Sequence, residues 1–231
     1  MGAGASSTGA NNTTPTAAVQ ASDVSSLVAL AQTGTDEQKE SSVAALCSFA
    51  GSTDKAENAA AVVAAGGVKL LVELAKSGTD QQKANAAAAL WHIGFNDENK
   101  VAIANAGGVD LLVGLARTGT DAQKEKAAVA LGRLAINDDI TVAIAAAGGI
   151  EPLVAMCAGG TDAQKEEAAG ALWSLAYDNE SNQRAIAAAG GVETLVALVK
   201  SGSTDAQKEN AAAVLEALAA VADEVAIAKA R

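Results

Sequence analysis

The chain has 231 residues; half are hydrophobic but only 2% are aromatic, so its apolar mass consists mainly of Ala, Val, Leu and Ile. Ala is the best helix former, and this composition favours an all-helical protein. The 16 basic and 27 acidic residues give a formal net charge of −11, which repels phosphate backbones, and no basic cluster compensates for it. We therefore expect no nucleic-acid partner. A protein or peptide partner of basic character is favoured, or the acidity only keeps an apolar-rich protein soluble.

Residues 1–20 contain Gly, Ala, Ser, Thr, Asn and Pro15 but no charge, and we expect a flexible leader. Its first six residues match the N-myristoylation pattern, with Gly2 as the acceptor and Ser6 at the sixth position. An acylated Gly2 predicts weak membrane association; the alternative is an unmodified, disordered leader. No uncharged apolar run is long enough for a membrane span, so none is expected.

A Thr-Asp-x-Gln-Lys block occurs five times, and it begins at Thr35, Thr79, Thr120, Thr161 and Thr204. The successive offsets of 44, 41, 41 and 43 residues fall in the range of about 40–47 that is typical of stacked helical repeats. The repeat therefore predicts a row of helical units in place of a single globular core.

One unit predicts three helices. The first covers residues 100–106, a Gly-Gly pair ends it, and the second covers 109–117. Thr120 then serves as the N-cap of a third helix over residues 121–136. Gln123 stands three residues further on and completes a capping box.

The same pattern divides the remainder of the chain. Residues 21–51 form a partial unit with only a second and a third helix. The segment 222–231 is expected to be a C-terminal partial cap, formed by the first helix of a further unit. Between them lie four complete units, over residues 52–95, 96–136, 137–177 and 178–221.

The repeated sequence Ala-Gly-Gly-Val, Leu-Val-x-Leu and Gln-Lys-x-x-Ala-Ala-x-Ala-Leu-x-x-Leu-Ala resembles the armadillo repeat in its plant, algal or protist style. The resemblance covers about residues 20–231. It implies an all-α, right-handed α-solenoid of about five repeats, with three helices per repeat. In this family the third helices line a concave groove that binds extended peptides or partner proteins.

Importin-type members of the family carry an Asn on each third helix and a Trp one turn before it. The Asn positions here hold Ser48, His92, Arg133, Ser174 and Ala217. The Trp positions hold Ala44, Ala88, Val129, Gly170 and Ala213. Both ladders are missing, which speaks against importin-type recognition of basic peptides, but the groove itself is still expected.

The five aromatic residues of the chain all fall in predicted third helices, and two pairs of them are one helical turn apart. Such a strip predicts either a binding surface, since Trp, Tyr and Arg dominate interface hot spots, or packing between neighbouring units. The candidate binding residues are Trp91, His92, Phe95, Lys126, Arg133, Ile136, Trp173, Ser174 and Tyr177.

Catalytic and metal-binding patterns are missing from the sequence. The single histidine, His92, has no nucleophile near it in the predicted fold. Cys47 and Cys157 are expected to be buried free thiols of a reducing, cytoplasmic compartment. We expect no enzyme, no cofactor and no metal site. The leading hypothesis is a protein-interaction scaffold; the alternatives are a structural subunit that docks by its convex or end surfaces, and an engineered repeat scaffold.

Overall fold

The computed structural model describes residues 21–229, which form fourteen helices without a strand in that range. The helices are α1 (Ala21–Thr33), α2 (Asp36–Ala50), α3 (Lys55–Ala64), α4 (Gly67–Ser77), α5 (Asp80–Ile93), α6 (Asp97–Asn105), α7 (Gly108–Thr118), α8 (Asp121–Leu134), α9 (Asp138–Ala146), α10 (Ile150–Gly159), α11 (Asp162–Ala176), α12 (Glu180–Ala188), α13 (Gly191–Ser201) and α14 (Asp205–Lys229).

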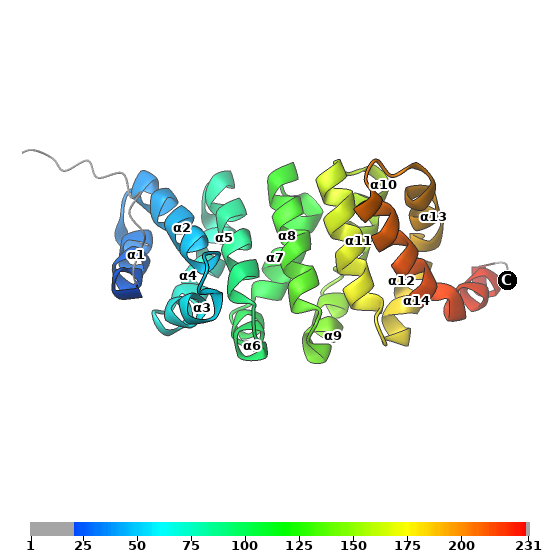
Figure 1. The fold of residues 1–231 in the computed structure, drawn as a ribbon, viewed down its shortest axis with the longest axis horizontal. Helices are drawn as coiled ribbons and strands as arrows, with labels where there is room; N and C mark the ends of the chain where they lie inside the picture. The colour runs from blue at the N-terminus through cyan, green and yellow to red at the C-terminus, as the bar shows by residue number, and fades with distance from the viewer. Residues whose placement is uncertain (1–20, 230–231) are drawn as a thin grey trace, which may run out of the picture.

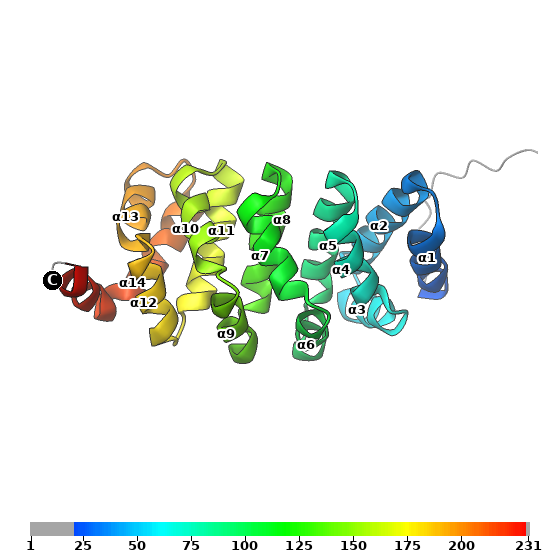
Figure 2. The same cartoon turned by 180° about the vertical axis from the view of Figure 1, so that it is seen from behind.

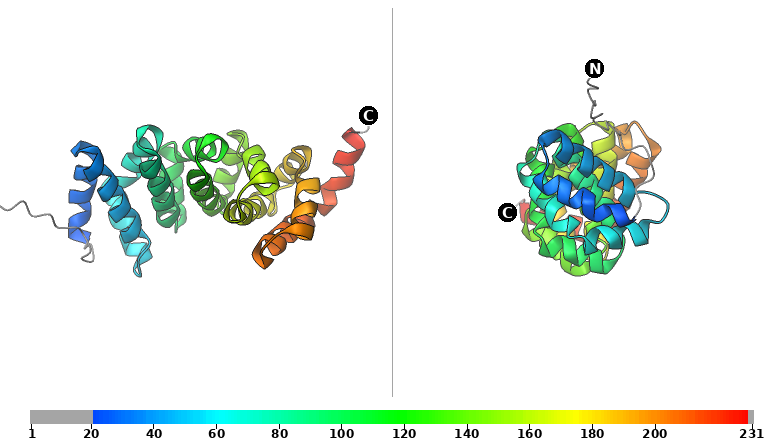
Figure 3. Two further views of the ribbon diagram at one scale, coloured as in Figure 1. Left: turned by 90° about the horizontal axis from the view of Figure 1, so that it is seen from above. Right: turned by 90° about the vertical axis from the view of Figure 1, so that its left-hand side faces the viewer.

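The helices stack in chain order along one axis, so that α1 and α14 lie at opposite ends of an elongated molecule (Figures 1 and 3). The third helices α2, α5, α8 and α11 lie side by side, and we call their joint surface the third-helix face (Figure 1). The first helices α3, α6, α9 and α12 form one edge of the molecule. The second helices α4, α7, α10 and α13 lie on the side away from the third-helix face (Figure 2). This arrangement confirms the predicted α-solenoid.

The third helices begin where the Thr-Asp-x-Gln-Lys blocks predict. Thr35, Thr79, Thr120 and Thr161 each accept a hydrogen bond from the backbone of the Gln three residues on, whose side chain bonds back to the Thr N–H. The fifth block differs because Ser203 is inserted before Thr204. There the Ser203 N–H donates to the Gln207 side chain at 2.9 Å.

The Gly-Gly pairs separate first from second helices for two physical reasons. Gly107 has φ 82, in the left-handed region where a side chain is strained, and the first glycine of each other pair is similar. At Gly108 a Cβ atom would lie 2.5 Å from Cγ2 of Ile103, so the second glycine lets the helices meet.

The C-terminal expectation was wrong. A separate first helix was predicted in the segment 222–231, but α14 runs as a single helix from Asp205 to Lys229. The other third helices end before an Asn or Asp at the N-cap position of the next helix, whereas Ala219-Ala220-Val221-Ala222 contains no residue that ends a helix.

The core is a continuous row of Leu, Ile, Val and Ala side chains that runs through all the stacked repeats. Leu90, Leu131 and Leu172 occupy equivalent positions in α5, α8 and α11 and are almost fully buried. Each repeat buries its apolar face against its neighbours, as expected for a quasi-one-dimensional stack.

Within residues 21–229 no single helix is long and apolar enough to cross a membrane. The pairs α3–α4, α6–α7 and α9–α10, bent by 79°, 76° and 77°, pass the same test of length and composition when each pair is taken together.

Candidate protein-binding face

The third-helix face contains a hollow of about 630 Å³ that spans α2, α5, α8 and α11. All of its lining comes from these four helices and from Ile136, which follows the end of α8. The lining residues used below are Cys47, Trp91, His92, Glu125, Lys126, Arg133, Ile136, Glu167 and Ser174. The lining also includes small residues, among them Gly132, where a Cβ atom would lie 3.2 Å from Cα of Ala171 in α11.

Six of the nine predicted binding residues line this hollow: Trp91, His92, Lys126, Arg133, Ile136 and Ser174. The remaining three lie outside its lining. They are large and exposed side chains, namely Phe95, Trp173 and Tyr177.

The sequence had placed all nine predicted residues within third helices, but three of them lie outside these helices. Phe95, Ile136 and Tyr177 lie just past the ends of α5, α8 and α11, because these helices end earlier, at Ile93, Leu134 and Ala176. The three side chains occupy equivalent positions and are 52%, 61% and 67% exposed. They form a ladder of apolar side chains along the edge of the third-helix face.

The aromatic contacts differ in part from the predicted pairs. Trp173 and Tyr177 do lie together, with ring centroids 5.7 Å apart. Trp91 instead packs against His92, with ring centroids 4.3 Å apart, and the guanidinium carbon of Arg133 lies 5.6 Å from the Trp91 ring centroid. Trp91 is half-buried, and it serves both as packing and as the platform for a cation.

The α5 side of the hollow is electrostatically positive. Burial lowers the pKa of His92, and the positive charges of Lys55, Arg133 and Lys126 lower it further. The His92 ring lies against Gly51, where a Cβ atom would come within 2.7 Å of its Cε1. His92 is therefore a neutral, packed side chain at neutral pH.

The α11 side of the hollow is acidic. Burial raises the pKa of Glu167, and the negative charges of Glu166 and Glu125 raise it further, while Lys126 opposes them. Lys126 already forms an ion pair with Glu125 at 2.7 Å. Lys126 of α8 therefore acts on both His92 of α5 and Glu167 of α11, and basic and acidic groups line one hollow.

The two cysteines differ in their surroundings, which corrects the expectation that both are buried. Cys157 is buried in α10, and burial raises its pKa to about 12. Cys47 is half-buried and lines the same hollow as His92, although the sequence had placed no cysteine near that residue. Burial raises the pKa of Cys47, with Lys126 in opposition, so both groups are thiols at neutral pH.

The capping glutamines have a second role that the sequence analysis missed. The amide of each Gln from the second block onward donates to the backbone carbonyl of the first residue of the preceding third helix. These bonds join Gln82 to Asp36 at 3.2 Å, Gln123 to Asp80 at 3.0 Å, Gln164 to Asp121 at 3.0 Å and Gln207 to Asp162 at 2.9 Å. The capping box uses only the side-chain oxygen of each Gln. Its two N–H donors need partners when the side chain is buried, and this need could have predicted a bond to a neighbouring repeat.

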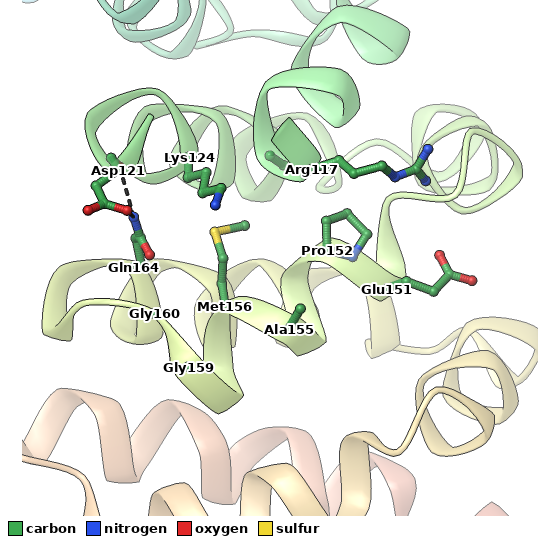
Figure 4. Close-up of a pocket in the computed structure, with 11 residues that line it drawn as sticks. Arg117, Asp121, Lys124, Glu151, Pro152, Ala155, Met156, Gly159, Gly160 and Gln164 are labelled. Carbon is green, nitrogen blue, oxygen red and sulfur yellow. Dashed lines mark hydrogen bonds between the residues drawn. The ribbon is translucent and has the colours of Figure 1, made fainter. Parts of the chain in front are cut away.

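A second kind of hollow lies where second helices meet the next repeat. One of about 410 Å³ has Lys124 and Met156 facing each other across it, with Gln164 bonded to Asp121 at its edge (Figure 4). Another of about 480 Å³ is lined by the equivalent residues one repeat earlier, including Lys83, Leu115 and Gln123. Such hollows arise from the repeat itself, whereas the lining of the hollow on the third-helix face differs from one repeat to the next.

Among the described residues no group of His, Cys, Asp and Glu side chains is arranged to hold a metal ion.

Fold and face together define an α-solenoid repeat protein. Residues 55–95 and 96–136 match the Armadillo/beta-catenin-like repeat family, and the chain belongs to the armadillo-repeat family. No curated protein matches the chain.

Three solved structures illustrate the similarity. The crystal structure of one engineered protein is 35% identical with a TM-score of 0.79, and the match covers 85% of this chain but 47% of that one. A second engineered protein is 34% identical with a TM-score of 0.81, over 89% and 84% of the two chains. A designed armadillo repeat protein in complex with the peptide (KR)4 is 25% identical with a TM-score of 0.79, over 85% and 82%.

Proposed function

We propose that the protein is a non-catalytic interaction scaffold, whose third-helix face binds an extended segment of a partner protein. The observation that carries this proposal is the hollow of about 630 Å³ on that face, lined by residues that depart from the repeat. Ligand sites are typically concave, mostly apolar and lined by a few polar groups, and this hollow fits that description.

The exposed ladder of Phe95, Ile136 and Tyr177 extends the surface beyond the hollow. Ile136 belongs to both, so hollow and ladder are continuous. Neighbouring helices pack about 8–10 Å apart, and a chain in the extended polyproline II conformation rises about 3.1 Å per residue with three residues per turn. Such a chain would pass one repeat in about three residues and bring every third side chain to the same face. A partner segment with an apolar side chain at every third position could therefore contact successive members of the ladder.

The designed relative in complex with (KR)4 supports peptide binding as a property of this architecture. The net charge of −11 attracts cationic partners at long range, which supports a partner that is basic overall.

Raised pKa values of Cys47 and Cys157 support a non-catalytic role, because an activated thiol needs a lowered pKa. Free cysteines also support a reducing, cytoplasmic location. Gly2 lies outside the described residues, and its acylation stays a prediction.

The proposal is tested by affinity capture from cell extract, followed by mass spectrometry and by direct binding with each purified candidate. The test variant carries Ile136→Ser and Tyr177→Ser. The matched control is Val196→Ser, which removes an exposed apolar side chain from the second helix α13.

We expect the control to retain the partner and the test variant to lose it by about tenfold or more, since buried hot-spot residues each contribute about 1–2 kcal/mol or more. The proposal would be contradicted if Val196→Ser lost the partner while the variant with Ile136→Ser and Tyr177→Ser still bound it. That result would favour docking through the second-helix side.

A further inference from the structure

We propose that the occupant of the hollow presents a carboxylate to the guanidinium of Arg133 above Trp91, so that an acidic side chain of the bound segment marks its register. The inference rests on the proposed function and adds to it the chemistry of one position. It assigns a local acidic contact within a partner that can be basic elsewhere.

Arg133 is the cation in the hollow whose charge is not neutralised. Its guanidinium makes no ion pair or hydrogen bond with any residue of the described range, whereas Lys126 pairs with Glu125 at 2.7 Å. The planar, forked donors of an arginine match a carboxylate in a bidentate geometry. Arg133 therefore offers an anion site that the protein itself leaves open.

Trp91 holds this guanidinium in place. The Arg133 side chain crosses from α8 to α5, where its guanidinium carbon lies 5.6 Å from the Trp91 ring centroid. Its stem packs close to Gly94, where a Cβ atom would be 3.4 Å from Cγ of Arg133. A cation held against a ring loses less entropy when it binds, and it keeps its N–H edge available to a ligand.

The surroundings of Arg133 favour an anion. Lys55 of α3 and Lys126 of α8 act with Arg133 on His92 of α5, so positive charge gathers at this side of the hollow. The acidic lining residues are Glu125 of α8, which is paired with Lys126, and Glu167 of α11. A carboxylate placed at the Arg133 guanidinium would therefore be attracted by the cation of the hollow that no acidic side chain of the described range pairs with.

The test uses three libraries of immobilised dodecapeptides in which every third position is fixed as Glu, Gln or Lys. The remaining positions are one common mixture of apolar and neutral residues, so that only charge differs between libraries. The proteins compared are the full chain, Arg133→Gln, and the control Lys69→Gln. Lys69 is an exposed residue of α4, so the control makes the same charge change outside the third-helix face.

A second measurement follows the NMR signals of His92, the single histidine of the chain. A carboxylate bound beside Arg133 opposes the positive charges that act on the imidazole, so its pKa rises when a Glu peptide binds. A structural effect of Arg133→Gln on folding alone would not produce this rise in the unmutated protein.

We expect the Glu library to bind more tightly than the Gln library, and Arg133→Gln to abolish this preference while Lys69→Gln leaves it unchanged. The loss should be about tenfold, as expected for about 1.4 kcal/mol from one charge-assisted contact. A Lys library that binds best on the third-helix face, with Arg133→Gln neutral or favourable, would overturn the carboxylate assignment and leave the proposed function intact. Equal failure of all three libraries would contradict both proposals.

Discussion

The side-chain amide of Gln164 donates a hydrogen bond to the backbone carbonyl of Asp121 across a repeat boundary, at 3.0 Å (Figure 4). The same side chain accepts a bond from the Thr161 N–H at 3.2 Å, and its amide also reaches the Asp121 carboxylate at 3.0 Å. One residue therefore caps its own helix and joins that helix to the preceding one. The Gln164 side chain is 2% exposed, although its partners Thr161 and Asp121 are exposed residues.

The first prediction concerns this link. Gln164→Ala should lower the free energy of unfolding by about 2–4 kcal/mol, because it removes a cap, the hydrogen bonds to Asp121 and the packing of a buried side chain. Gln38→Ala is the matched control. Gln38 is exposed and caps α2 through Thr35, and among residues 21–229 its amide has no hydrogen bond to a preceding third helix. We expect about 1 kcal/mol for that variant in urea unfolding; equal losses for the two variants would contradict the inter-repeat role.

A second prediction compares two helical glycines. A Cβ atom at Gly132 would lie 3.2 Å from Cα of Ala171, whereas one at Gly114 would meet nothing within 4 Å. Gly114→Ala should raise the free energy of unfolding by about 1 kcal/mol, as helix propensity predicts. Gly132→Ala should be less favourable than Gly114→Ala by about 1–2 kcal/mol, because α8 and α11 must move apart. Thermal and urea unfolding would measure the difference; no difference would mean that Gly132 is not needed for close packing.

The third prediction concerns Ser42, a buried residue of α2. Its hydroxyl has no hydrogen-bond partner among the described residues. The equivalent position in α5, α8 and α11 is Ala86, Ala127 and Ala168. Ser42→Ala should therefore raise the free energy of unfolding by about 1 kcal/mol, because it removes an unsatisfied polar group. The reciprocal variant Ala168→Ser should lower it; a loss of stability in Ser42→Ala would contradict this interpretation.

The fourth prediction concerns pH. Burial, followed by Lys55, Arg133 and Lys126, lowers the pKa of His92 below its ordinary value of 6.5. The unfolded chain then binds this proton at a higher pH than the folded chain does. The stability linked to neutral His92 is complete above pH 6.5 and is lost as the pH falls through the lower pKa of the folded state.

The variant His92→Gln should lack this component of the pH dependence. Urea midpoints of the two proteins, measured across a series of pH values, should therefore converge as the pH falls below 6.5. A stability difference that grows on acidification would show that His92 is protonated more readily in the folded state.

The sequence predicted the architecture because its local signals agree with one another. The Thr35, Thr79, Thr120 and Thr161 blocks each carry an N-cap and its Gln partner, and the Gly-Gly pairs supply left-handed residues. These signals act within a few residues, so their spacing alone predicts the helix order and the register of the third-helix face.

The remaining features depend on contacts between repeats. Cys47 and His92 line one hollow because neighbouring third helices are side by side, although they are far apart in sequence. The early helix ends before Phe95 and Ile136 are bound by the following first helices, where Asn99 donates to the Ile93 carbonyl at 2.9 Å and Thr141 to the Ala135 carbonyl at 2.6 Å. The length of α14, in contrast, was readable from the missing helix-ending residues near Val221.

The most direct measurement of peptide binding at the third-helix face is site-specific photo-crosslinking. A photoreactive phenylalanine analogue replaces Ile136 in one protein and exposed Lys69 on α4 in another, and each is irradiated with the pooled dodecapeptide libraries. We predict peptide adducts at position 136 that Arg133→Gln shifts away from Glu peptides, and background levels at position 69. Adducts that form at position 69 and not at position 136 would contradict binding at the third-helix face.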